Sequence, residues 1–344
     1  MPIVGTVVAV SNRSKGAGQL MIAIVLIAIA AGCASALMFA SIISGALISL
    51  LLFYLAPLPL MVAEIGWGPL SAIIGGIGAA IGLGAIFGLP YCIAFVVMVA
   101  LPACWLGHLA LLGRPATNGI SSSNGALPVA PDLEWYPVGR VLLWVTGFAA
   151  LTTMAALLTL GTDADTITGT LRRGLLRIIV SSDAASTGEI EQFINALVTI
   201  APAAAAIFAM LTLTLNLWLA AKITATSGGL HRPWPDLKST ALPPMTLVLL
   251  FVAIALCFIG GLLAILALIV ATALIMAYAF TGFAVLHMLT LALKSRALWL
   301  SCAYTVVIVF SWPVLVIAAL GLADAVFGLR QRYLQGRPPP IPAP

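Results

Sequence analysis

Long apolar runs without charged residues alternate with short polar connectors along the chain. Residues 20–63 and 69–113 contain no Asp, Glu, Lys or Arg. A membrane-spanning helix needs about 20 apolar residues, so each run is long enough for two helices. The pattern predicts helices at 20–37, 39–56, two within 69–113 divided at Gly88–Pro90, 139–160, 197–221, 245–267, 269–293 and 297–321. Because adjacent short helices can merge, we predict an all-α, polytopic integral membrane protein with eight to nine transmembrane helices.

One polar connector, residues 162–196, has helical periodicity. Its apolar residues recur at helical spacing, with the arginines largely on the other side: Ile167, Leu171, Leu175 and Ile178 against Arg172, Arg173 and Arg177. This pattern is typical of an amphipathic helix on the membrane surface. Connectors 114–138 and 222–244 are predicted loops. The expected organisation is a cytoplasmic segment 1–19, a membrane domain 20–335 and a disordered, proline-rich tail 336–344.

Composition narrows the class of protein further. Hydrophobic residues make up 62% of the 344 positions and charged residues 7%, whereas a soluble domain carries about 25% charged residues. This balance excludes a soluble enzyme and a nucleic-acid binder with a basic face. No GxxxxGK[ST], HExxH, GxSxG or CxxC motif is present, so we expect no catalysis, no metal site and no cofactor.

Rare polar groups inside apolar runs are the candidates for a binding site, because ionisable side chains are costly within a membrane. The candidates are Glu64, Trp67, Asn216 and His287. Glu64 is either hydrated at the membrane interface or placed at a cavity rim beside Trp67. His287 either faces a polar cavity, which we hypothesise it shares with Glu64, or bonds a neighbouring helix. Asn216 either holds helices together or contacts a ligand.

A second group of residues has structural roles, as helix breaks and as charged groups near the C-terminal end of the last helix. Pro57 and Pro59 predict a helix boundary or an exposed kink, and Pro313 predicts a kink in the last helix. Asp324 and Arg330 are six positions apart, too far for the pairing that neighbours on one helix use. The partner of Asp324 is therefore expected elsewhere, for example in the backbone of a loop.

Several stretches carry a family resemblance by their order and spacing: residues 54–68, 215–220, 282–287 and 312–332, with the loop 231–236 (HRPWPD). Together they resemble the YybS-like family of predicted bacterial membrane proteins (domain of unknown function 2232) over residues 20–335. That family is similar to the S components of energy-coupling-factor vitamin transporters and, more distantly, to the rod-shape protein MreD.

The resemblance implies a multi-pass protein of the bacterial cytoplasmic (inner) membrane with an S-component-like helical bundle. Such a protein would be non-catalytic and would bind a small molecule or take part in its transport. Its implied partners are membrane lipids, a small-molecule ligand, and a coupling membrane protein with an ATPase module, but no nucleic acid. The alternative is a structural or assembly protein of the MreD kind, without a small-molecule ligand.

Overall fold

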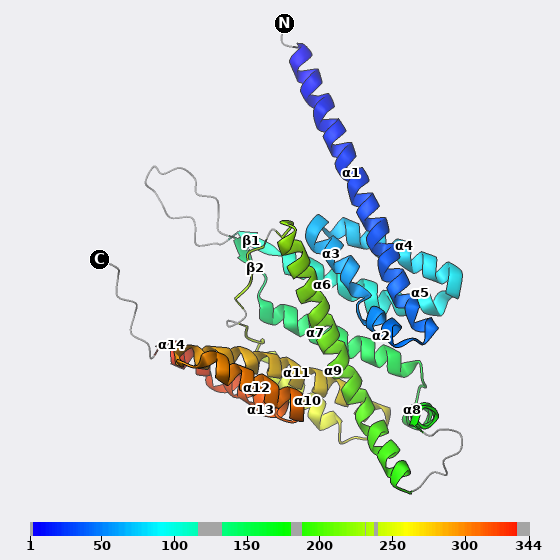
Figure 1. Cartoon of the computed structure of the whole chain (residues 1–344), viewed down its shortest axis with the longest axis vertical. Coiled ribbons are helices and arrows are strands. Elements are labelled where there is room, and N and C mark those ends of the chain that lie inside the picture. Colours follow the sequence, from blue (N-terminus) through cyan, green and yellow to red (C-terminus); the bar gives the residue numbers. More distant parts are fainter. Residues whose placement is uncertain (1–2, 116–132, 180–187, 231, 237–239, 336–344) are drawn as a thin grey trace. The chain divides into compact units, whose positions relative to one another are not determined.

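The computed structural model describes residues 3–115, 133–179, 188–230, 232–236 and 240–335. The predicted tail 336–344 and much of the predicted loop 114–138 lie outside these described residues. The chain divides into two compact units, each treated by itself below. The first unit comprises Met1–Tyr136 with Thr212–Pro233, and the second comprises Pro137–Leu211 with Trp234–Pro344. Figure 1 labels the elements in chain order.

Helices make up almost all of the first unit, as the apolar runs predict. Its elements are α1 (Ile3–Ala40), η1 (Ser41–Ser44), α2 (Leu47–Tyr54), α3 (Pro57–Trp67), α4 (Pro69–Phe87), α5 (Leu89–Phe95), a π-helical turn η2 (Val96–Ala100), α6 (Leu101–Leu111), β1 (Gly113–Pro115) and β2 (Leu133–Trp135). The two strands pair antiparallel, with Arg114 opposite Glu134. The second half of α9 (Gly188–Thr226) also belongs to this unit.

Glycines with positive φ separate consecutive helices in this unit. Gly68 and Gly88, both at φ 92°, end α3 and α4. Backbone of this kind suits glycine because it has no Cβ. A proline follows within two positions of each glycine, at the start of the next helix, where its missing N–H is not needed. The predicted break at Gly88–Pro90 is confirmed.

The predicted helix 39–56 is wrong. The chain leaves α1 at Ala40, turns at Gly45 with φ 67°, and then continues through α2 and α3. These two helices form one candidate membrane span, Leu47–Trp67. Pro57 is buried at the start of α3, so the break at Pro57 and Pro59 lies inside a candidate span and is not an exposed kink.

The second unit contains the remaining helices: α7 (Val138–Leu158), α8 (Ala164–Ile179), the first half of α9, α10 (Met245–Leu256), α11 (Gly261–Leu289), η5 (Thr290–Ala292), α12 (Arg296–Phe310), α13 (Val314–Phe327) and α14 (Leu329–Gln335). Two predicted boundaries move. Gly260 and Gly261, at φ 87° and 64°, separate α10 from α11. Ser311, at φ 58°, separates α12 from α13, so Pro313 precedes a new helix and does not kink a continuous one.

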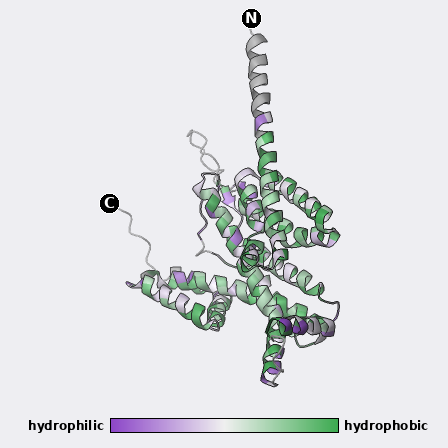
Figure 2. Cartoon of the chain, turned by 45° about the vertical axis from the view of Figure 1, so that its right-hand side comes forward, coloured by the Kyte–Doolittle hydropathy of each residue, from purple (hydrophilic) through white to green (hydrophobic). Residues whose placement is uncertain are grey.

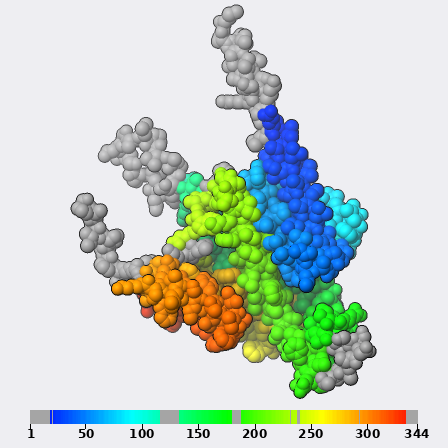
Figure 3. Space-filling view, in the orientation of Figure 1, coloured from blue at the N-terminus to red at the C-terminus, as the bar shows by residue number. Residues whose placement is uncertain are grey.

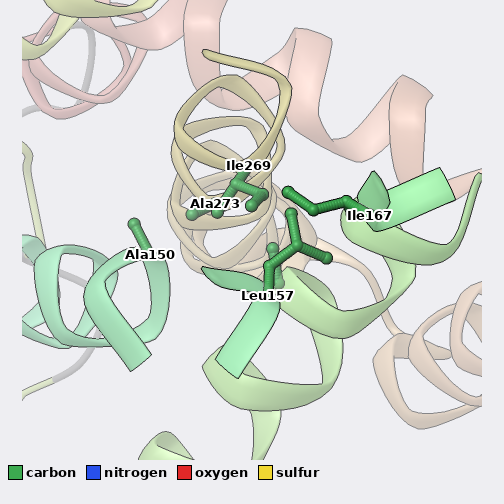
Figure 4. Close-up of a cluster of buried hydrophobic side chains, with 6 residues drawn as sticks. Ala150, Leu157, Ile167, Ile269 and Ala273 are labelled. Carbon is green, nitrogen blue, oxygen red and sulfur yellow. The ribbon is translucent and has the colours of Figure 1, made fainter. Parts of the chain in front are cut away.

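The amphipathic connector forms α8 and the beginning of α9, and α8 is the expected short amphipathic helix, whose place on the membrane surface stays a prediction. Asp163 caps α8, because its carboxylate accepts hydrogen bonds from the backbone N–H and the hydroxyl of Thr166. Ile167 points from α8 to Ile269 of α11 and to Leu157 of α7 in a buried cluster (Figure 4). Part of the apolar stripe therefore faces protein.

Several helices are long and apolar enough to cross a membrane. Within the described residues there are seven such segments by length and composition: Met21–Ser44, Leu47–Trp67, Pro69–Phe87, Leu89–Leu111, Val138–Leu158, Gly188–Thr226 and Gly261–Leu289. Three shorter apolar helices are α10, α12 and α13. Most of the helical ribbon has the colour of hydrophobic residues in Figure 2. Ile308 of α12, a helix drawn in orange in Figure 3, is 77% exposed. The chain is thus a multi-pass helical membrane bundle.

Candidate functional site

Two glycines let α11 and α13 approach each other closely. A Cβ added at Gly282 would clash with the backbone carbonyl of Ile317, and one added at Gly321 would clash with the carbonyl of Tyr278. Small residues at such crossings allow backbone contact between membrane helices. The expected close approach at Gly282 is confirmed, and it places Asp324, one turn beyond Gly321, beside the end of α11.

A buried ion pair closes the end of α13. Gly328, in the left-handed conformation (φ 62°, ψ 43°), ends α13, and α14 starts at Leu329. Across this turn Asp324 Oδ1 accepts the backbone N–H of Arg330 at 2.9 Å, while Oδ2 accepts from Nε at 2.8 Å. Arg330 Nη2 lies 2.7 Å from the same Oδ2. Both residues are buried.

The expectation that Asp324 finds its partner away from Arg330 is wrong. The spacing rule applies to a continuous helix, whereas Gly328 ends α13 between the two residues. Arg330 also donates from Nη1 to the carbonyl of Thr240 at 2.8 Å. The pair therefore joins α13, α14 and the segment before α10.

A pocket of about 860 Å³ lies beside this ion pair, and we call it the Asp324 pocket. Its polar lining residues come from several elements, and apolar side chains such as Phe327 complete it. The polar residues are Asp236, Tyr278, Thr281, Asp324, Arg330 and Gln331. The hydroxyl of Tyr278 is 2.7 Å from that of Thr246 on α10, which fixes the ring at the pocket wall. Pockets of this size accommodate small organic molecules.

Asn216 joins α9 to the proline break in the first unit. Its Nδ2 donates to the carbonyl of Tyr54 and to that of Thr212, both at 2.8 Å. Pro57 has no N–H to offer Tyr54, and the N–H of Leu58 bonds Leu55 instead. Asn216 therefore satisfies a carbonyl that the proline break leaves without a helical partner, as expected of a residue that holds helices together.

Glu64 lies inside the first unit and not at its surface. Its side chain is 0% exposed, and α6 packs directly over it at Gly107. The interpretation of Glu64 as a hydrated interfacial residue is therefore wrong for this structure. Trp67, one turn further along α3, is 48% exposed. It lines an apolar groove of about 350 Å³ together with Ile27, Ala30, Ala31, Leu58, Pro59, Val62, Ala63 and Ile223, a lining that does not include Glu64.

His287 occupies the last turn of α11. Its Nδ1 is 3.0 Å from the carbonyl of Phe283, one turn earlier in the same helix. Because a carbonyl only accepts, we assign the ring proton to Nδ1. The ring also contacts Tyr304 of α12 at 5.9 Å between ring centroids. This bond is within α11, and the described residues show no hydrogen bond from the ring to a neighbouring helix, which was one of its two predicted roles.

The four candidates do not form one described site. Glu64, Trp67 and Asn216 lie in the first unit, where no hydrogen bond among the described residues joins any two of them. His287 lies in the second unit. The hypothesis that His287 and Glu64 share a cavity stays a prediction.

Sequence reasoning missed the residues that organise the polar loops. Arg232 donates to the carbonyls of Ala110 and Tyr136, at 2.9 and 3.0 Å, and its guanidinium lies 5.8 Å from the centre of the Trp135 ring. Burial lowers the pKa of Arg232 from its usual value.

Sequence reasoning also missed Tyr278. A buried phenol inside an apolar helix needs a hydrogen-bond partner, and this requirement could have identified Tyr278 from the sequence.

Comparison with known proteins gives one match. Searches of the curated proteins and of the solved structures found nothing similar. A family described as "Predicted membrane protein (DUF2232)" matches residues 180–325. The matched region includes Asn216, Tyr278, His287 and Asp324, and excludes Glu64 and Trp67. The family resemblance read from the sequence is therefore confirmed for residues 180–325, less than half of the chain, and that region is similar to this predicted membrane protein family.

Proposed function

We propose that this membrane protein is non-catalytic and binds a small molecule, or takes part in its transport, through the Asp324 pocket. The supporting observation is a pocket of about 860 Å³ that combines apolar side chains with a buried ion pair at its wall. Ligand sites typically join an apolar lining to a few fixed polar groups that orient the ligand. The Asp324–Arg330 pair supplies such fixed groups.

The resemblance to S components supports a role in transport. It implies a separate coupling membrane protein and an ATPase module as partners. This chain has no GxxxxGK[ST] motif, so ATP hydrolysis in such a scheme falls to another protein. The same resemblance favours the bacterial inner membrane as the location.

One observation favours the alternative, a structural or assembly protein of the MreD kind without a small-molecule ligand. Both oxygens of the Asp324 carboxylate already accept hydrogen bonds from Arg330. The pair would then serve only to hold α13, α14 and Thr240 together. The two functions differ in whether a ligand occupies the pocket.

Native mass spectrometry of the detergent-purified full chain separates the two. We expect an adduct of small-molecule mass, distinct from detergent and phospholipid. Ala325→Trp, at an exposed position lining the pocket, should abolish it. Ala319→Trp, at an exposed position of α13 outside that lining, is the matched control and should retain it. No adduct, or an adduct equally retained by Ala325→Trp, would overturn the proposal in favour of the structural alternative.

A further inference from the structure

Glu64 is enclosed in a part of the chain that is apolar enough to span a membrane. It lies on α3 within the candidate span Leu47–Trp67, with its side chain 0% exposed. Among the described residues, neither Oε1 nor Oε2 has a hydrogen-bond partner. None of the ion pairs among the described residues includes Glu64. A carboxyl group is therefore buried without a partner.

The fold makes room for this side chain at one point on α6. A Cβ at Gly107 would lie 2.9 Å from the Cβ of Glu64 and still closer to its Cγ. Real Cβ atoms do not approach that closely, so only glycine lets α6 close over the carboxyl group. The nearest hydroxyl on α4 is otherwise engaged, because Ser71 donates to the carbonyls of Ala63 and Gly68.

Among the described residues, none with a positive charge forms an ion pair or a hydrogen bond with the Glu64 carboxyl group. Arg232 bonds the carbonyl of Ala110 at the end of α6. The elements packed against α3 are α1, α4, η2 and α6. Helix α6 carries a partly buried Cys104 and an exposed His108. Among the described side chains, α1 contributes only Cys33, while α4 and η2 carry no titratable group. Lys222, on the part of α9 that touches Gly66 through Thr224, is exposed.

An ionised carboxylate without a partner is costly in such a place, whereas the neutral acid costs far less to bury. We propose that Glu64 is an intramembrane proton-binding site, whose carboxyl group holds a proton inside the enclosure formed by α3 and α6. Binding is a reversible transfer in which a hydronium ion gives its proton to a carboxylate oxygen and leaves as water. Intramembrane carboxyl groups serve in this way in proton relays.

Glu64 lies near the end of α3, which is also the end of the candidate membrane span. The half-exposed Trp67 is the last residue of α3, and three residues of helix span about 4.5 Å. A metal cation is less suited to the site, since it would need several oxygen ligands. Within the described residues no group of three or more His, Cys, Asp or Glu side chains is placed to hold one. This proposal does not depend on the Asp324 pocket.

Infrared spectroscopy of the full chain, purified in detergent and labelled with ¹³C-carboxyl glutamate, tests the proposal without any substitution. The other three glutamates, Glu134, Glu189 and Glu191, have exposed side chains. We expect one carbonyl-stretch band of a protonated carboxylic acid that shifts with the label and disappears as the pH is raised. Glu64→Gln should abolish the band completely, and the exposed Glu134→Gln should leave it unchanged.

Two results would overturn the proposal. The first is the absence of any label-sensitive acid band at neutral pH, which would mean that Glu64 is ionised. The second is a band that vanishes at fixed pH when sodium chloride replaces choline chloride, which would assign the site to a metal cation. Because glutamine matches the shape of the neutral acid, we also expect Glu64→Gln to melt at the wild-type temperature.

Discussion

Breaking the Asp324–Arg330 pair should destabilise the second unit strongly. Asp324→Asn removes the negative charge and Arg330→Met removes the guanidinium, while both keep similar side-chain volumes. The two side chains are 7% and 11% exposed, so neither charge is well solvated once its partner is lost. Three contacts connect the carboxylate to Arg330, one through the backbone N–H and two through the guanidinium.

The expected magnitude follows from these contacts. A hydrogen bond to a charged group contributes about 1.5–3 kcal/mol, and two side-chain contacts meet the same oxygen. Removing one partner of a buried pair typically costs about 3–5 kcal/mol, because it leaves an uncompensated charge. We therefore expect each single variant to lose about 3–5 kcal/mol of unfolding free energy. The double variant should lose less than the sum by about 1–3 kcal/mol.

Reversible unfolding in mixed micelles measures these losses, and the chain contains a matched control. Arg114 and Glu134 form an ion pair at 2.8 Å with side chains 75% and 54% exposed. Such surface pairs contribute about 0–1 kcal/mol, so Arg114→Met and Glu134→Gln should have little effect. Single losses at Asp324 and Arg330 as small as those of the control, or strictly additive losses, would refute the reasoning from burial.

Three further substitutions test other contacts. Asn216→Leu removes the bond to the Tyr54 carbonyl and should cost about 0.6 kcal/mol in micelle unfolding, the average for interhelical bonds; a loss of fold would contradict this. Gly282→Ala should cost about 1–3 kcal/mol by forcing α11 from α13, whereas Gly147→Ala, which faces open space, should cost nothing. Hydrogen bonds from Thr166 lower the pKa of Asp163. The stabilisation that this cap gives α8 should therefore be complete above the ordinary aspartate pKa and be lost as the pH falls through the lowered pKa of Asp163. Faster amide hydrogen exchange in α8 would report that loss. In Asp163→Ala, the α8 amides should exchange fast already at neutral pH.

Hydropathy locates the helices of this chain well, but it does not locate their ends. An apolar run of about 20 residues predicts a span because the bilayer sets that length. The breaks at Gly45, Gly260 and Ser311 depend on backbone conformations with positive φ. Serine and glycine at these positions have no distinctive hydropathy, so the hydropathy pattern predicted unbroken helices across them.

The candidate site was predictable only in part, because enclosure depends on distant segments. Glu64 stood out as a rare acid, but its burial results from Gly107 on another helix. Asp324 and Arg330 were both recognised, yet their pairing required knowledge of the turn at Gly328. Asn216 does link two helices, one of the two roles left open for it, since a buried amide must find a partner.

The bond from Asn216 to the Tyr54 carbonyl also sets an order of events during synthesis. The two residues are 162 positions apart, so the ribosome completes α2 and α3 long before it makes this part of α9. Until then, this bond cannot form. Because the second half of α9 belongs to the first unit, that unit acquires its last helix only after α7 and α8 have been translated.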